Sequence, residues 1–483
     1  MLTLGHILEA LTGYQAGGGA QVITDVAIDS RLIIPGALFV ALPGERTDGH
    51  EFVSAAFGKG AVAALVQRDL PAGGPEAAPF HVLDLRQPVT HAMAQMADLR
   101  LPVCLRVDDS LKAMQALAAW WRKRLSVRVV GVTGSVGKTT TKELVASVLD
   151  KRYCTFKSEG NLNNEIGLPL MLLKLTEAHE RAVLEMGFYE PGEIKFLCDL
   201  ANPQIGVVTN VYPVHLERAG SIEAIAQGKG ELVEALPSAP DGVAVLNYDD
   251  PLVLGMRSRT RARVVTYGLD PQADVWADDI ESQGLEGILF QLHYRHERLH
   301  LRVPLLGRHS AHTALRAAAV GLVDNLTWQE IIEGLQALGA AQIRLAAVTG
   351  PNGSLILDDT YNASPESVIA ALNLLHELDG RHVAVLGDML ELGSFEETGH
   401  RMVGRRAREV ADLLVTVGPR ARLIADEARQ SGLASAAVVE VADGPAALAY
   451  LRAHVAAGDV VLLKGSRALH LDRVVAELEA GEP

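Results

Sequence analysis

The sequence predicts an α/β protein of three domains: a smaller N-terminal α/β domain, a central P-loop ATPase-like parallel sheet and a C-terminal Rossmann-like doubly wound domain. At 483 residues, the chain is long enough for about three domains with separate cores. A β-branched run at 127–132 leads through a glycine-rich turn into a helix. Strand and helix signals alternate over 182–247 and again over 354–463, which implies parallel sheets with ligands at the carboxyl ends of their strands.

The composition indicates a soluble protein of a reducing compartment. A formal charge of −15 argues against nonspecific binding to nucleic acid or to an anionic membrane surface. Cys104, Cys154 and Cys198 lie far apart without metal-ligand spacing. No apolar run approaches the ~20 residues needed to span a bilayer, and residues 1–13 predict a short amphipathic helix, not a signal peptide. We therefore expect a cytoplasmic protein, by default a monomer.

The predicted N-terminal domain covers residues 1–107. Ser30 and Arg31 lie beside a glycine-containing loop and could bind a diphosphate or a base, although a solvated turn is the more frequent outcome for such a pair. The stretch from Leu70 to Pro102 contains Pro and Gly clusters and one predicted helical piece at 91–99. We assign it no role from the sequence.

The glycine-rich turn carries the main functional signal. Gly134 and Gly137 bound a tight turn, and Lys138 then opens a helix that is expected to end at residue 149. Such a turn points backbone N–H groups at one spot, where the positive end of the helix also favours an anion. Lys138 can place a point charge on phosphate, and the Thr139 hydroxyl can bind Mg²⁺. Val132 replaces the first glycine of the strict P-loop pattern, so the motif is the shortened form T-G-x-x-G-K-T-T, which predicts binding of a nucleoside triphosphate.

The predicted central domain covers residues 108–343. Its expected elements, besides the P-loop strand and helix, are a helix at 109–125, strands at 182–186, 205–211 and 243–247, and a helix at 221–236. Glu185 ends a strand, where a carboxylate is well placed to hold Mg²⁺, although a capping or ion-paired glutamate is equally common there. A polar loop before it can hydrogen-bond a phosphate or substrate through Asn161, Asn163 and Asn164. His215 and Lys229 are weak signals by themselves.

Two clusters in the central domain favour structural interpretations. Residues 285–305 alternate apolar and polar side chains, as an antiparallel pair does, and place His293, His296 and His300 close together in sequence. Neighbours at 293 and 296 would face opposite sides of a strand, which favours a surface hairpin over a zinc site. The four arginines at 257, 259, 261 and 263 predict a solvated face, not a nucleic-acid patch.

The predicted C-terminal domain covers residues 344–483 and alternates strands with helices. Strands are expected at 354–357, 382–386, 412–417, 437–441 and 460–463, with helices starting near residues 365, 396, 421, 444 and 469. This alternation is typical of a second doubly wound sheet.

The ordered motifs along the chain resemble the Mur ligase family, and within it the MurF branch. These motifs are DSR…PGALFVALPGERTDGH, TGSVGKTT, GNLNNEIGLP, EMG, HLE, AQGKGE, NYDD, GRH, DDTYNASP, GDMLELG and KGSR. They cover essentially the whole chain. GNLNNEIG and GDMLELG are the specific pointers to the MurF branch, and the Asp-Asn-Pro-Arg signature of a diaminopimelate-adding MurE-type enzyme is absent from the sequence.

The resemblance implies a role for each candidate residue. Catalytic roles would fall to Lys138, His215 and Lys229. Contacts to ATP would come from Gly134, Ser135, Val136, Gly137, Lys138, Thr139, Thr140, Asn247, Asp250, His309, Arg344 and Asp359. Substrate contacts would come from Ser30, Arg31, Asn161, Asn163, Asn164 and Asn362. Two Mg²⁺ ions would be held with the help of Thr139, Glu185, His215 and Lys229, and Lys229 matches the family lysine that reacts with CO₂ to form a carbamate.

The implied reaction is the ATP-dependent joining of D-alanyl-D-alanine to a UDP-N-acetylmuramoyl-tripeptide through an acyl phosphate, in cytoplasmic peptidoglycan precursor synthesis. The chain departs from the family pattern Gly-x-His-Asn-x-x-Asn, because Ser310 and Thr313 replace the two asparagines, and Ser158 stands where Thr is usual. A hydroxyl offers fewer donors than an amide, which weakens the expected contacts on the adenine side. The alternatives are a MurE-type ligase that adds a diamino acid, a folylpolyglutamate-synthetase-like ligase, and a silent nucleotide-binding scaffold.

Overall fold

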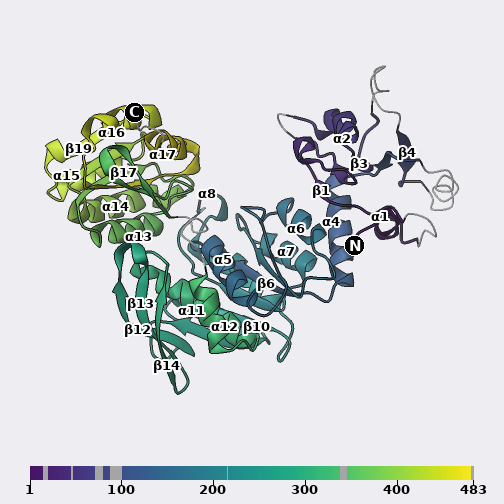
Figure 1. Cartoon of the computed structure of the whole chain (residues 1–483), viewed down its shortest axis with the longest axis horizontal. Helices are drawn as coiled ribbons and strands as arrows, with labels where there is room; N and C mark the ends of the chain where they lie inside the picture. The colour runs from purple at the N-terminus through teal and green to yellow at the C-terminus, as the bar shows by residue number, and fades with distance from the viewer. Residues whose placement is uncertain are drawn as a thin grey trace. The chain divides into compact units, whose positions relative to one another are not determined.

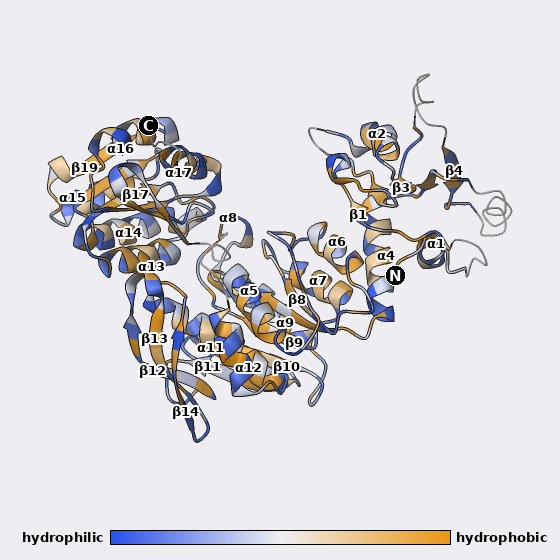
Figure 2. Ribbon diagram, in the orientation of Figure 1, coloured by the Kyte–Doolittle hydropathy of each residue, from blue (hydrophilic) through white to orange (hydrophobic). Residues whose placement is uncertain are grey.

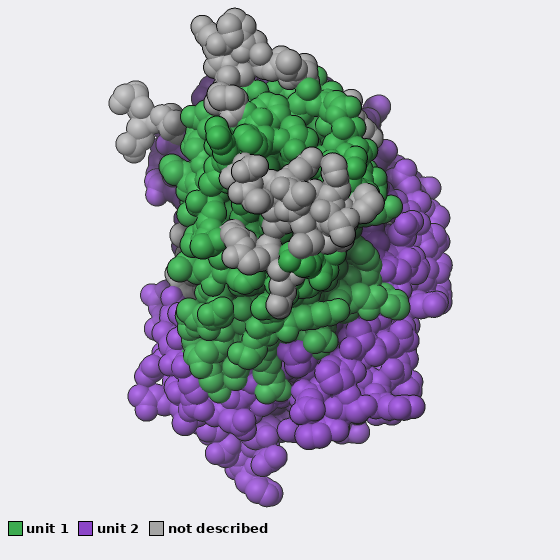
Figure 3. Space-filling model, turned by 90° about the vertical axis from the view of Figure 1, so that its right-hand side faces the viewer, with its two compact units in different colours: residues 1–130, 153–186, 195–203 green, residues 131–152, 187–194, 204–483 purple. Residues whose placement is uncertain are grey.

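The computed structural model describes residues 1–14, 20–44, 47–70, 80–87, 100–214, 216–337 and 345–479. Two compact units contain them (Figure 3). Unit 1 is made of residues 1–130, 153–186 and 195–203, and unit 2 of residues 131–152, 187–194 and 204–483. Within the described ranges, every helix is too short or too polar to cross a membrane.

Unit 1 begins with a parallel sheet of five strands in the order β1-β2-β3-β5-β4. The strands are β1 (Val26–Ala27), β2 (Leu38–Val40), β3 (Ala63–Val66), β4 (His81–Asp84) and β5 (Val103–Arg106), with helices α1 (Leu4–Thr12) and α2 (Val53–Gly58). One apolar cluster joins Phe39, Ala64 and Cys104 of the sheet to Val53 and Phe57 of α2. The predicted helical piece at 91–99 lies outside the described residues.

The rest of unit 1 is organised by a long helix. Its elements are α4 (Ser110–Arg124), β7 (Thr155–Lys157), α6 (Gly167–Leu173) and β8 (Arg181–Glu185), together with most of α7 (Glu193–Ala201). Asp109 caps α4 by accepting from the backbone N–H groups of Leu111 and Lys112, at the start of the helix that the sequence predicts over 109–125. The buried guanidinium of Arg122 donates to the carbonyls of Ala201, Leu125 and Val127, so it ties the end of α4 to neighbouring loops.

Strand β6 (Arg128–Thr133) belongs to both units and carries the chain into the glycine-rich turn. In unit 2 the strands run in the order β14-β13-β12-β11-β10-β9. Their bounds are β9 (Ile205–Val208), β10 (Val243–Asn247), β11 (Arg263–Gly268), β12 (Val275–Ser282), β13 (Ile288–Tyr294) and β14 (Glu297–Val303). The helices are α5 (Lys138–Leu149), α8 (Leu216–Ala219), α9 (Ile222–Glu234), α10 (Pro251–Gly255), α11 (Ala311–Val323) and α12 (Trp328–Gln336). Strands β9 to β12 pair in parallel, whereas β12, β13 and β14 pair antiparallel.

The antiparallel pair predicted at 285–305 is confirmed as β13 and β14. His293 stacks on Trp276 with ring centroids 3.7 Å apart, and its Nε2 lies 2.8 Å from Oδ1 of Asp278. This histidine is therefore part of the packing of the sheet. Of the four arginines predicted to form a solvated face, Arg259 differs, because its guanidinium pairs with Glu234 and donates to the carbonyls of two α9 residues.

The C-terminal part of unit 2 is a six-stranded sheet in the order β15-β16-β20-β17-β18-β19, with β15 antiparallel and the others parallel. The strands are β15 (Ala346–Thr349), β16 (Leu355–Asp358), β17 (Arg381–Gly387), β18 (Leu413–Val417), β19 (Val438–Val441) and β20 (Asp459–Lys464). The helices are α13 (Pro365–His376), α14 (Glu396–Val410), α15 (Arg422–Gln430), α16 (Gly444–His454) and α17 (Leu471–Glu479) (Figure 1).

Alternate residues of these strands enter two separate cores. On β17, Ala384 and Leu386 pack with α13, α14 and α15, whereas Val383 and Val385 pack with α16 and α17. A strand exposes successive side chains to opposite faces, so helices cover both faces of this sheet. The covering helices carry hydrophobic and hydrophilic residues side by side, as α14 does in Figure 2. The predicted α/β fold class is confirmed.

Candidate active site

The glycine-rich turn between β6 and α5 has the conformation that its glycines allow. Gly134 has a φ of 147° and Gly137 a φ of 81°, both in the region that L side chains rarely adopt. A Cβ on Gly134 would lie 1.8 Å from Oγ1 of Thr209. Only glycine therefore fits at position 134.

The turn is fastened to the segment that follows β9. The Val136 N–H donates to Oδ1 of Asn210 at 2.8 Å, and the Val136 carbonyl accepts from the Thr209 hydroxyl at 2.7 Å. Ser135 exchanges hydrogen bonds with the backbone of Tyr212. The predicted strand 205–211 was therefore too long. Strand β9 ends at Val208, because the next residues leave the sheet and bond to the glycine-rich turn.

The side chains that open α5 lie on this turn. Lys138 directs its Nζ to the carbonyl of Gly134 at 2.8 Å. The ammonium group therefore lies at the loop whose backbone N–H groups would bind a phosphate. Thr139 and Thr140 are half-buried in the first helical turn. The arrangement provides backbone N–H groups, a helix N-terminus and a lysine at one place, which is what a polyphosphate requires.

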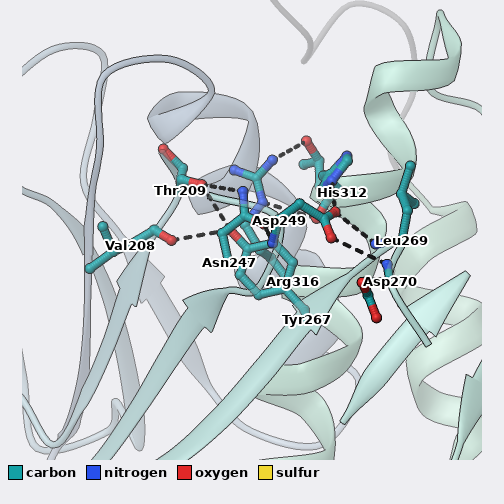
Figure 4. A network of polar contacts seen from close by, with 10 residues as sticks. Val208, Thr209, Asn247, Asp249, Tyr267, Leu269, Asp270, His312 and Arg316 are labelled. Atoms are coloured by element: carbon teal, nitrogen blue, oxygen red, sulfur yellow. Dashed lines mark hydrogen bonds and ion pairs between the residues drawn. The ribbon is translucent and has the colours of Figure 1, made fainter. Parts of the chain in front are cut away.

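A polar network lies behind the turn (Figure 4). The Asn247 amide donates to the Thr209 carbonyl at 3.0 Å, and the buried Tyr267 hydroxyl donates to the same carbonyl at 3.0 Å. Asp249 accepts from the backbone N–H of Leu269 and lies 2.7 Å from Nε2 of His312. The contact between Asp249 and His312 was not expected from the sequence, since 63 residues separate them.

Asp250 has a defined local role. One of its carboxylate oxygens accepts from the N–H groups of Leu252 and Val253, which makes Asp250 the N-cap of α10. The other accepts from the Val211 N–H at 2.8 Å and so supports the segment that holds the P-loop. A contact between Asp250 and a nucleotide stays a prediction.

Lys229 is buried on α9, with only 1% of its surface exposed. Its Nζ lies 4.6 Å from the centre of the Phe188 ring. Burial lowers the pKa of this amine well below its ordinary value, and the positive charge of Lys138 lowers it further. The fold therefore disfavours the ammonium form of this side chain.

Unit 1 contains Glu185 and the asparagine-rich loop. Glu185 is buried at the end of β8, and its Oε1 accepts from the Asn163 amide at 2.8 Å. The Glu185 N–H donates to the hydroxyl of Ser158. Ser158, which stands where the family usually has threonine, therefore supports the backbone of the glutamate. Asn164 accepts from the N–H of Gly167 at the start of α6 and has a structural role. Asn161 lies exposed in the same loop.

The C-terminal sheet positions a buried ion pair. Lys464 at the end of β20 donates to Oδ2 of Asp359 at 2.6 Å and to the carbonyl of Asn362 at 2.9 Å. The pair joins the DDTYNASP and KGSR motifs across adjacent strands. The hydroxyls that replace the family asparagines make internal bonds, because Ser310 donates to the Leu306 carbonyl and Thr313 accepts from Arg316. His309, which precedes them, is exposed.

The predicted uridine-nucleotide residues of unit 1 lie on its surface. Arg31 forms two-pronged hydrogen bonds with Asp29, whose pKa this guanidinium lowers to about 2. Ser30 is half-buried beside them in a short 3-10 turn. The pairing fixes the Asp-Ser-Arg segment and leaves Arg31 84% exposed.

Two predicted residues, His215 and Arg344, lie outside the described residues. Among the residues that the structure does describe, no three His, Cys, Asp or Glu side chains gather closely enough to hold a metal ion. The metal set predicted from Thr139, Glu185, His215 and Lys229 thus stays a prediction.

Comparison with known proteins gives this fold and site a family. Family models match in chain order: "Mur ligase family, catalytic domain" at residues 22–100, "Mur ligase middle domain" at 132–321 and "Mur ligase, glutamate ligase domain" at 343–467. The chain belongs to the Mur ligase family.

Its full-length relatives are of the MurF type. UDP-N-acetylmuramoyl-tripeptide–D-alanyl-D-alanine ligase of Bacillus subtilis is 36% identical, covering 99% of this chain and 98% of the relative. The Escherichia coli enzyme of that name is 35% identical, with 99% and 98% covered. A crystal structure of MurF from Acinetobacter baumannii superposes with a TM-score of 0.81 at 29% identity, covering 99% and 98%. MurF of Thermotoga maritima in complex with ADP gives 0.76 at 28%, with 98% of each chain covered.

The two ligase families named as alternatives have the same fold, but they are less similar to this chain in sequence and in structure. A folylpolyglutamate synthase from Mycobacterium tuberculosis gives a TM-score of 0.59 at 18% identity, covering 77% of this chain and 95% of its own. A diaminopimelate-adding ligase gives 0.51 at 18%, with 96% and 93% covered. These likenesses concern the fold alone.

Proposed function

We propose that the chain is an ATP-dependent ligase that joins D-alanyl-D-alanine to a UDP-N-acetylmuramoyl-tripeptide in peptidoglycan precursor synthesis. One observation carries the proposal: the relatives that match along the whole chain bear the name of that reaction, with 98% of the Bacillus subtilis relative covered. The P-loop geometry supports the ATP half of the reaction. In this proposal the binding partners of the protein are its small-molecule substrates, and the reaction takes place in the cytoplasm.

The P-loop side chains would act on the triphosphate. Backbone N–H groups from Gly134 to Thr139 would surround the phosphates, and Lys138 would neutralise charge that builds up during transfer. The tripeptide carboxylate would attack the γ-phosphorus, the bond to the β–γ bridging oxygen would break, and ADP would leave. The amine of D-alanyl-D-alanine would then attack the acyl carbon, lose a proton and expel inorganic phosphate. Positioning and charge stabilisation should supply most of the rate.

The donor set suits Mg²⁺, a cation that prefers oxygen ligands. Glu185 is buried with an amide donor on one of its oxygens, and Thr139 has a hydroxyl at the start of α5. When bound, the metal would shield the crowded negative oxygens of the phosphates. His215 and two metal ions belong to the same proposal.

Lys229 would contribute as a carbamate. A neutral amine adds CO₂ to give a carbamate and releases a proton. The side chain then ends in two carboxylate oxygens, which can bind a metal ion, in place of a single amine nitrogen. The burial of Lys229 and its lowered pKa favour the neutral amine that this addition needs. The product would be an anion beside the positive Lys138, in a place where an ammonium group is disfavoured.

Three domains would divide the work. Residues 1–107 would hold the uridine nucleotide with Ser30 and Arg31, 108–343 would hold ATP, and 344–483 would complete the site with Arg344 and Asp359. Asn161, Asn163, Asn164 and Asn362 would contact substrate, and Asn247, Asp250 and His309 the nucleotide. The ranges of the three family models support this division.

A single acceptor panel tests the function. The protein is incubated with ATP, Mg²⁺ and the UDP-muramoyl-tripeptide, then offered D-alanyl-D-alanine, diaminopimelate, lysine or glutamate in turn, while phosphate release is measured. We expect release with D-alanyl-D-alanine, and its loss in Lys138→Ala. Release with a diamino acid or glutamate instead would reassign the chain to an alternative ligase. No release with any acceptor would favour a scaffold.

A further inference from the structure

One buried arginine behind the P-loop has no place in the proposed mechanism. Arg316 lies on α11 with only 4% of its surface exposed. Its guanidinium donates to the Thr141 hydroxyl at 2.8 Å, to the Thr313 hydroxyl at 3.1 Å and to the His312 carbonyl at 2.9 Å. All three acceptors are neutral.

No acidic side chain of the described chain forms an ion pair with Arg316. The ring centre of Tyr267 lies 5.5 Å from the guanidinium carbon (Figure 4). Burial accordingly lowers the pKa of Arg316. A buried cation without a nearby anion is costly, because neutral dipoles replace only part of the hydration that it loses.

The position of this charge points to the loop. A Cβ built on Gly137 would lie 3.4 Å from Nη1 of Arg316, so the guanidinium lies against the last glycine of the P-loop. Thr141, which accepts from Arg316, donates its own hydroxyl to the Gly137 carbonyl at 2.7 Å. A hydrogen-bonded chain thus runs from Arg316 through Thr141 to the residue that caps α5.

Three positive groups lie together at Gly137. The N-terminus of α5 is the positive end of the helix dipole, Lys138 follows immediately, and Arg316 adds a third positive group. A cation at a helix N-terminus is repelled by the positive end of the helix dipole and lowers the stability of the protein. An anion bound at the same place attracts both the dipole and the cation, and so raises the stability.

We propose that Arg316 is a positioning residue of the nucleotide site: it orders the Gly137 end of the P-loop through Thr141, and the phosphates of the bound nucleotide supply its missing counter-charge. The inference rests on the proposed function, since it requires a nucleotide at this loop. Thr313 contributes by accepting from Arg316 at a position where the family pattern has asparagine.

Arg122 offers a matched control. It is a second arginine with 4% exposure, it also donates to neutral acceptors, and burial also lowers its pKa. It lies at the end of α4 in unit 1, whereas the P-loop glycines lie in unit 2. Replacing it removes the same kind of side chain without touching the loop.

The test measures thermal unfolding and MgADP binding by the full-length wild-type, Arg316→Met, Arg316→Lys and Arg122→Met proteins. We expect Arg316→Met to bind MgADP roughly tenfold more weakly, about 1.4 kcal/mol, with a smaller deficit at high salt because ions screen the interaction. Its nucleotide-induced rise in Tm should be smaller than that of the wild type at the same MgADP concentration. Arg316→Lys should recover part of the affinity. Arg122→Met should lower Tm while keeping the nucleotide-induced rise.

Three results would overturn the inference. Arg316→Met could bind MgADP within twofold of the wild type, it could fail to fold, or it could behave as Arg122→Met does. Each would make Arg316 a structural anchor. A wild-type protein that shows no response to MgADP would instead overturn the proposed function, and this inference with it.

Discussion

Gly134 and Thr209 approach so closely that a single added carbon would disrupt the P-loop. A Cβ on Gly134 would lie 1.8 Å from the Thr209 hydroxyl oxygen, and the φ of 147° at Gly134 is itself unfavourable for an L residue. The same hydroxyl donates to the Val136 carbonyl. Gly134 and Thr209 therefore set the shape of the loop together.

Gly134→Ala should weaken MgADP binding by more than tenfold, because both the contact with Thr209 and the backbone angle oppose the new side chain. Isothermal titration calorimetry measures the effect. The double variant Gly134→Ala with Thr209→Ala should recover only part of the affinity. It removes the contact with the hydroxyl oxygen, but it leaves the Cβ of residue 209 at 2.9 Å and the backbone angle unchanged. Full recovery would show that the angle is unimportant.

The neighbouring amides Asn163 and Asn164 should separate function from stability. Asn163 donates to Glu185, so Asn163→Ala should raise the Mg²⁺ concentration needed for half-maximal phosphate release several-fold and change Tm little. The Asn164 side chain accepts from the backbone N–H of Gly167, so Asn164→Ala should cost about 1 kcal/mol of unfolding free energy through the lost hydrogen bond. Magnesium titrations and urea unfolding of both variants check this contrast. An unchanged magnesium dependence in Asn163→Ala would argue against Glu185 as a ligand.

Lys229→Ala should lower phosphate release by at least about 100-fold, because it removes the oxygen donors that a carbamate would supply. Short carboxylic acids added to the assay should restore part of the activity by filling the space of the lost side chain. Chloride salts at equal ionic strength are the control. Full activity of the variant without any acid would exclude the carbamate role.

His400 predicts a pH dependence of stability in the C-terminal sheet. Its ring accepts from the Met389 N–H of the GDMLELG motif at 3.1 Å and lies 2.7 Å from the Glu396 carbonyl, an arrangement that needs the neutral imidazole. Burial lowers the pKa of His400 below 6.5. The unfolded chain therefore binds a proton before the folded chain does, and stability falls as the pH decreases below about 6.5.

Unfolding by urea at pH 7.5, 6.5 and 5.5 measures this effect in the wild type and in His400→Gln. The histidine should contribute a loss of at most about 1.4 kcal/mol per pH unit. His400→Gln, which keeps an acceptor for Met389, should show a shallower decline. Identical slopes in both proteins would place the acid sensitivity elsewhere.

Much of the architecture could be predicted because it depends on local pattern. The strand at 243–247 and the starts of α13, α14 and α16 lie where the alternation of apolar residues and caps indicates. The strand predicted before it, 205–211, was too long. Thr209 and Val211 are β-branched as strand residues often are, but Thr209, Asn210 and Tyr212 bond to the P-loop. Sequence pattern does not distinguish those two fates.

The sequence by itself determined that a polyphosphate loop opens α5, because its glycines, lysine and threonines are contiguous and act through backbone geometry. Only the tertiary structure revealed the groups behind the loop. Arg316 meets Thr141 across 175 positions of the chain, and Asp249 meets His312 across 63. Such contacts depend on how helices pack against a sheet. The local sequence around one residue of each pair does not indicate which distant residue it will contact. The P-loop was predictable as a motif, whereas the buried charge beside it was a product of the fold.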